Sequence, residues 1–210
     1  MGSYNQFAGR SLDRIAALSD GLFAVAMTLI VLEVHVPLKA AVHSEHDLWL
    51  ALAALAPRAV TYVLSFITLG IFWVGQQTQL DQLDHGDRNL AWLHVAFLAV
   101  VAVMPFSTEL LADFIAFRAA LLVYWANLLL LGVALFVTWS YSVHAGLLKA
   151  DTHPQVVQAV RRRIVVGQML YGFGAALCLV NTYWSIGFIV TIQVYYAFAP
   201  RIPVVSRLLT

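Results

Sequence analysis

The sequence predicts an all-α, polytopic membrane protein with six transmembrane helices. Of its 210 residues, 61% are hydrophobic and only 11% are charged, whereas soluble domains carry roughly 25% charged residues. The mean hydropathy is +0.81. About 20 apolar residues span the hydrocarbon core of a bilayer, so the chain has room for six spans and no soluble domain of normal size. We therefore expect residues 1–210 to form a single transmembrane domain.

The first apolar run predicts a helix over residues 11–36. Ser11 is of the residue type that caps helix N-termini, and Pro37 marks the expected end. The small residues 24–26 lie inside the run rather than after it. This position favours a retained helix over a cleaved signal peptide.

Polar and charged interruptions divide the rest of the apolar sequence into five further spans. They are expected at 48–79, 88–111, 116–147 and, as a tight hairpin, within 164–199. The last stretch is about twice the length of one span, so its turn is expected near Asn181 to Ser185. Residues 149–163, with Pro154 and three consecutive arginines, are expected to form a polar connection.

Lys and Arg are distributed unevenly between the two sides that six spans define. Nine of the twelve lie on the side of the termini, and Lys39, Arg58 and Arg118 lie on the other. The positive-inside rule then predicts a cell-membrane (inner-membrane) protein with both termini in the cytoplasm. The formal net charge of +1 gives no reason to expect a nucleic-acid partner.

The sequence contains no motif typical of an enzyme or of a resident cofactor. His-Glu-x-x-His, Gly-x-Ser-x-Gly and Gly-rich phosphate loops are missing from it. His85 and its neighbouring aspartates could bind a divalent cation, although a solvated loop is the favoured interpretation. His35, His43 and His46 could sense pH on the outer side, which is the less favoured interpretation. Cys178 lies in an apolar run and is expected to be a core thiol. Together with the missing motifs, this leaves no residue that we expect to be catalytic or to bind a metal.

Three polar residues stand at the beginning of the first apolar helix: Arg14, Ser19 and Asp20. An Asp at the centre of a membrane-spanning helix costs roughly 2.5–3.5 kcal/mol on insertion scales. Such a carboxylate is therefore paired, or it faces water or the protein interior. Arg14 and Asp20 are six residues apart and share a helix face poorly. We expect Asp20 to accept a hydrogen bond from Trp73 or Gln76 and so to clamp the first two spans together.

Farther along the same helix, Val25, Thr28 or Leu29, and Leu32 recur at three- and four-residue spacing. Seven residues cover roughly 10 Å of helix axis. Ordinary helix packing explains this spacing on its own. Aliphatic rings that gate a pore by narrowing or dewetting would show the same spacing.

The segment Arg14-x-x-x-Leu18-Ser19-Asp20-Gly21 resembles the Arg-x-x-x-Phe-Ser-Asp signature of the transmembrane protein 175 family, the lysosomal potassium channels and their prokaryotic relatives. Phe72 to Gln76 resembles the end of that family's second helix, and Asn89 with Met104 to Phe106 resembles its third. Two residues depart from the family pattern. Leu18 replaces the usual Phe, and Gln76 replaces the usual His, which removes a titratable ring.

The resemblance implies a homotetramer in the bilayer, in which the first helices surround one pore for monovalent cations, with potassium as the permeant ion. Carried over by position, Val25 is the constriction, Thr28 a hydroxyl layer and Leu32 a lower-volume ring. Either Val25 or Leu32 could form the narrowest point. Because Val25 is smaller than the usual Ile or Leu, selectivity for potassium over sodium is expected to be weaker. The family's structural motif falls on the remaining site residues: Arg14, Ser19, Asp20, Gly21, Trp73 and Gln76. A small secondary transporter and a non-conducting scaffold remain the alternatives.

Overall fold

The structure, a computed structural model, describes residues 11–198. The helices are α2 (Leu12–Leu32), η1 (Lys39–Ala41), α3 (Glu45–Ala54), α4 (Ala56–Leu80), α5 (Arg88–Ala102), α6 (Met104–Asp113), α7 (Arg118–His144), α8 (Pro154–Ala176), η2 (Leu177–Leu179) and α9 (Thr182–Phe198). Within the described residues, β pairing is limited to one isolated bridge between Leu83 and Leu148. The predicted all-α class is therefore confirmed.

Within the described part of the chain, four helical segments are long and apolar enough to cross a membrane: α2, α4, α5 with α6 (Arg88–Asp113), and α7. The other two predicted spans correspond to α8 and α9, which form a hairpin joined through η2. The first half of α8 carries three arginines. α9 has 17 residues, which extend about 25 Å at 1.5 Å per residue. The six-span arrangement stays a prediction.

Prolines divide two of the predicted helices. The expected helix 48–79 is instead α3 and α4, which meet at Leu55, two residues before Pro57. The expected helix 88–111 is α5 and α6, which meet at Val103, two residues before Pro105. A proline inside a helix removes one backbone donor and clashes with the carbonyl four residues earlier, so each break falls where its proline dictates.

The prediction that residues 149–163 form a polar connection is wrong. Pro154 is the first residue of α8, and the three arginines lie inside that helix. Proline suits the first helical position because the backbone N–H that it lacks would have no intrahelical partner there. The hairpin turn also falls earlier than expected, because α8 gives way to η2 at Leu177 and α9 begins at Thr182.

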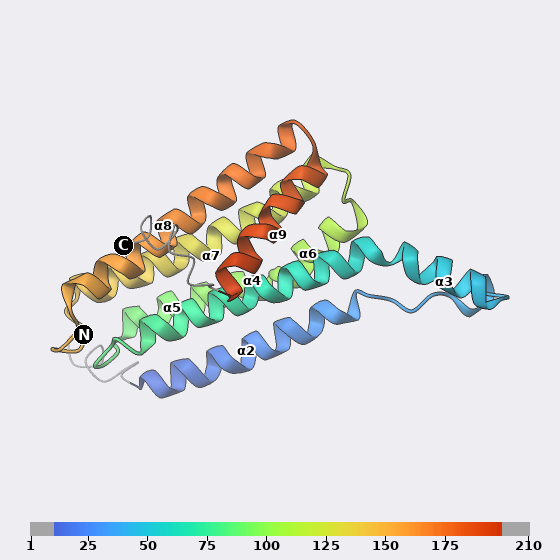
Figure 1. Cartoon of the computed structure of the whole chain (residues 1–210). Helices are drawn as coiled ribbons and strands as arrows, with labels where there is room; N and C mark the ends of the chain where they lie inside the picture. The colour runs from blue at the N-terminus through green and yellow to red at the C-terminus, as the bar shows by residue number, and fades with distance from the viewer. Residues whose placement is uncertain (1–10, 199–210) are drawn as a thin grey trace.

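The bundle places α2 and α8 at opposite edges (Figure 1). α2 packs against α4, α5 and α6, whereas α8 packs against α7 and α9. Ser11 caps α2 as expected, with its hydroxyl accepting from the backbone N–H of Arg14 at 3.3 Å. α2 ends at Leu32 rather than near Val36, because the N–H groups of Glu33 and Val34 bond only three residues back.

A buried polar network ties α4 to the helices around it. The Thr108 hydroxyl donates to Ser65 at 2.7 Å, and Ser65 donates to the Tyr124 hydroxyl at 3.3 Å. The amide of Gln193 on α9 donates to Thr68 on α4. Unsatisfied polar groups are costly in hydrocarbon, so these pairings fix which faces of α4, α6, α7 and α9 meet.

Candidate functional site

α2 has two distinct faces. Its buried residues recur at helical spacing and pack into the bundle: Ile15, Ser19, Phe23, Ala26 and Ile30. The opposite face carries large apolar side chains that the rest of residues 11–198 leaves largely exposed. Val25 is 55% exposed and Leu32 is 65% exposed. The first helix therefore presents an open surface along most of its length.

One line of residues runs along this open face at alternating spacings of four and three: Arg14, Leu18, Gly21, Val25, Thr28 and Leu32. We call this line the α2 stripe. All six residues are exposed in the subunit. The mean spacing of 3.6 residues equals the repeat of a straight α-helix, so the side chains of this row stay on one face over several turns. The predicted pore-lining residues Val25, Thr28 and Leu32 therefore share one face with Arg14 and Gly21 of the motif.

Two members of the α2 stripe have specific local geometry. The Thr28 hydroxyl donates its hydrogen to the Val25 carbonyl at 2.8 Å. Its oxygen therefore keeps its lone pairs as an acceptor. At Gly21, an added Cβ would meet no atom of residues 11–198 within 4 Å. Packing among these residues therefore gives no reason for glycine at this position.

Asp20 is held by α4 on the side of α2 next to the stripe. Its Oδ1 accepts hydrogen bonds from Trp73 Nε1 at 2.7 Å and from Gln77 Nε2 at 2.8 Å. The expected bond from Trp73 is present. Gln77 is a partner that the sequence interpretation missed, although its position four residues after Trp73 places both on one face of α4.

Ser19 makes a second, fully buried contact with α4. Gln76 Nε2 donates to Ser19 Oγ at 2.7 Å, and Ser19 Oγ donates to the Ile15 carbonyl at 2.9 Å. Gln76 therefore bonds to Ser19 rather than to Asp20. We call the contacts of Ser19 and Asp20 with Trp73, Gln76 and Gln77 the α2–α4 clamp. Arg14 is exposed, and its side chain has no hydrogen bond or ion pair within residues 11–198, so it is not part of this clamp.

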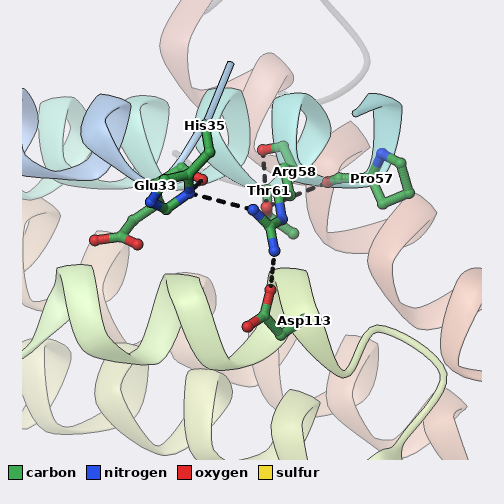
Figure 2. Close-up of polar contacts among 6 residues, drawn as sticks. All are labelled: Glu33, His35, Pro57, Arg58, Thr61 and Asp113. Carbon is green, nitrogen blue, oxygen red and sulfur yellow. Dashed lines mark hydrogen bonds and ion pairs between the residues drawn. The ribbon is translucent and has the colours of Figure 1, made fainter. Parts of the chain in front are cut away.

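A charged cluster lies where α2 ends and α4 begins. Figure 2 shows Arg58 between His35 and Asp113, with Nη2 donating to Asp113 Oδ1 at 2.8 Å. His35 Nδ1 lies 3.3 Å from Arg58 Nη1 and 3.0 Å from the Glu33 carbonyl oxygen. A neutral Nδ1 accepts from Arg58, whereas a protonated Nδ1 donates to that carbonyl. Asp113, the last residue of α6, is therefore held in an ion pair with Arg58.

Glu33, the residue after α2, has an altered pKa in this cluster. Burial raises the pKa of its carboxyl above the usual range, and the neighbouring Glu109 carboxylate raises it further. Its side chain points away from Arg58 (Figure 2).

Among the described residues, no group of three or more His, Cys, Asp or Glu could hold a metal ion. At the other end of the bundle, the Asp87 carboxylate caps α5 by accepting a hydrogen bond from the backbone N–H of Leu90. It also accepts a hydrogen bond from the Tyr141 hydroxyl. That hydroxyl in turn accepts from the side-chain amide of Asn89 at 3.1 Å.

The fold and this site define a polytopic, all-helical membrane protein whose first helix is clamped on one side and open on the other. A family model described as "Endosomal/lysosomal potassium channel TMEM175" matches residues 14–105. A protein of Streptomyces collinus named as a potassium channel is 31% identical over 199 residues, covering 92% of this chain and 95% of that protein. The chain therefore belongs to the TMEM175 family of ion channels.

Other relatives agree with this assignment. A protein of Chamaesiphon minutus, also named as a potassium channel, is 30% identical and covers 88% of this chain and 92% of that one. The crystal structure of a lysosomal potassium-selective channel TMEM175 homolog from Chamaesiphon minutus matches with a TM-score of 0.78 and 27% identity, over 90% of this chain and 97% of that one. The human endosomal/lysosomal proton channel TMEM175 is 22% identical, and the match spans 38% of its length.

Proposed function

We propose that the chain is one subunit of a homotetrameric, potassium-permeable channel whose α2 helices line a central pore. The observation that carries the proposal is the α2 stripe. It is the open face of the helix that the α2–α4 clamp holds. It combines bulky aliphatic side chains with a hydroxyl, a glycine and an arginine, a mixture that suits helix contact and water better than lipid tails.

Gly21 supports close contact between copies of α2. Glycine inside a helix costs roughly 0.5–1 kcal/mol relative to alanine, and no contact among the described residues requires it. Small residues let the backbones of membrane helices approach closely. A fourfold axis beside the stripe would bring four α2 helices together near Gly21 and leave Val25, Thr28 and Leu32 to form rings beyond it.

The three rings would act on a cation in different ways. Aliphatic rings of Val25 and Leu32 offer no ligands and act by size and dewetting. They are seven residues apart, about 10 Å along the axis. The Thr28 oxygens lie between them, and because each hydroxyl hydrogen is committed to the backbone, they can accept toward a partly hydrated cation. Conduction is passive in this mechanism.

We also propose six spans, with α8 and α9 as the last two, and both termini in the cytoplasm. Arg14, Arg88 and Lys149 lie at one end of the bundle, and Lys39, Arg58 and Arg118 lie toward the other. This separation agrees with the positive-inside rule. Accessibility of terminal tags on intact cells tests the arrangement, and an external C-terminus would contradict it.

The function is tested by recording from purified protein in planar bilayers. We expect unitary current steps and a reversal potential that favours potassium over sodium. The same recordings under a pH gradient would separate potassium from proton conduction, because relatives are named for either ion. A folded protein without unitary steps, but with slow ion exchange into vesicles, would favour the alternative of a small secondary transporter.

A further inference from the structure

A groove between α4, α7, α8 and α9 belongs to neither the α2 stripe nor the α2–α4 clamp. Its cavity volume is about 80 Å³, and its walls are mostly apolar, including Phe72, Leu135 and Ile164. Most of its lining residues lie on α8, α9 and the part of α4 facing them, and α8 is at the opposite edge of the bundle from α2 (Figure 1). A ligand there would contact the periphery of a subunit rather than the proposed pore.

The groove runs along the helices from a polar end toward the apolar interior. On α4 its lining extends from Ile71 to Gln79, one residue before the helix ends. These eight steps cover about 12 Å. Gly167 keeps the groove open on α8, because an added Cβ would meet only the Tyr196 hydroxyl, at 3.8 Å. The groove can therefore hold an elongated apolar group that enters from one membrane surface.

Arg163 stands at the polar end of this groove and lines it. Its guanidinium lies 5.9 Å from the centroid of the Tyr196 ring. Within residues 11–198 it forms no ion pair with a carboxylate. Among the described residues, Arg163 thus places a positive charge without a carboxylate partner beside an apolar groove.

We propose that this groove binds an anionic phospholipid, with part of one acyl chain against Phe72, Leu135 and Ile164 and the headgroup phosphate on Arg163. The cavity is too small for a whole lipid, so the rest of the molecule lies in the bilayer. Basic pockets between transmembrane helices bind anionic headgroups in this way. A free phosphate would satisfy Arg163 but leave the apolar groove empty. The inference requires that the chain spans a membrane and does not depend on ion conduction.

The test measures which lipids copurify with the full chain. Protein is equilibrated in mixed micelles of phosphatidylglycerol and phosphatidylcholine, and the bound lipids are quantified by native mass spectrometry. We expect enrichment of phosphatidylglycerol on the wild type. Arg163→Gln should reduce that enrichment about fivefold, the effect of one basic residue at an anionic surface. Excess inorganic phosphate should not displace the lipid.

Arg161→Gln is the matched control, because Arg161 lies on the same helix and packs over Phe136 at 5.5 Å instead of lining the groove. It should keep the enrichment. An equal loss in both variants would mean general surface charge and would overturn the proposal, as would displacement by phosphate alone. Gly167→Leu, checked for folding by size-exclusion chromatography, should also lose bound phosphatidylglycerol, and normal binding in that variant would exclude the groove as the site.

Discussion

The indole nitrogen of Trp73 donates a 2.7 Å hydrogen bond to the carboxylate of Asp20 and so joins α4 to α2. The neighbouring Ser19 is held by Gln76 in the buried layer beneath. Two adjacent residues of α2 are thus fixed to α4 at different depths. This arrangement sets the rotation of α2 about its own axis, and that rotation decides which side chains the α2 stripe presents.

Replacing Asp20 by Ala should destabilise the fold and reduce tetramer yield. The change removes the acceptor of two charge-assisted hydrogen bonds, from Trp73 and Gln77. Because the carboxylate is exposed, we expect a loss of about 1 kcal/mol, or about 2–4 °C in Tm. Thermal unfolding and size-exclusion chromatography measure the two effects. Asp13→Ala, an exposed change in the first turn of the same helix, is the control. An Asp20→Ala variant that assembled normally and lost only ion selectivity would contradict the role of the clamp.

The local chemistry of α2 and α4 could be predicted from sequence, but the choice of partners could not. A carboxylate such as Asp20 near the start of an apolar helix needs a hydrogen-bond donor, and the indole N–H of Trp73 could be predicted as that donor. Gln76 and Gln77 are adjacent and chemically identical, and only the relative rotation of the two helices decides that Gln76 faces Ser19 and Gln77 faces Asp20. That rotation depends on the packing of whole helix faces, which no single motif encodes.

The prolines show which helix boundaries can be predicted from the sequence. Pro57 and Pro105 break helices by simple steric rules, and those breaks could have been expected. From the sequence alone, Pro154 could either interrupt a connecting segment or begin a helix. Its place as the first residue of α8 became clear only with the structure, which extends that helix through the three arginines and places Arg163 beside a groove.

The ion pair between Arg58 and Asp113 should contribute little to stability. Their N–O distance is 2.8 Å, but the side chains remain 35% and 40% exposed. Partly exposed pairs are typically worth below about 1 kcal/mol and weaken with salt. A double-mutant cycle of Arg58→Gln and Asp113→Asn, measured by chemical unfolding at low and high salt, should give a coupling in that range. A larger coupling that salt did not change would show that the pair is shielded from solvent.

Glu33 should make stability depend on pH. Burial, assisted by Glu109, raises the pKa of its carboxyl, so the folded state holds this proton more tightly than the unfolded chain does. The resulting stabilisation is complete below the unfolded pKa of about 4.3 and is lost as the pH rises through the raised value. Glu33→Gln should remove this part of the Tm–pH profile. Glu45→Gln, an exposed change on α3, should leave it intact, and parallel profiles for wild type and Glu33→Gln would contradict the assignment.

Changing the size of Val25 should alter permeation if α2 lines the pore. Val25→Ala widens the proposed ring, so conductance should rise and sodium should enter more easily. A tenfold loss of potassium preference would move the reversal potential by about 59 mV. Val25→Phe should lower or abolish current while the protein still folds, because the side chain points out of the subunit.

The neighbouring Ala26 is only 3% exposed and belongs to the core, so a larger side chain there would disturb folding as well as any pore. Val31→Ala is the better control, because it makes the same chemical change on the same helix. Val31 is 44% exposed, and six residues of rotation place it about 120° from Val25. Reversal potentials and unitary currents under potassium and sodium gradients should change for Val25→Ala and stay constant for Val31→Ala. If both variants behaved like the wild type while substitutions on α4 altered selectivity, α2 would not line the pore, and the exposed stripe would instead face lipid.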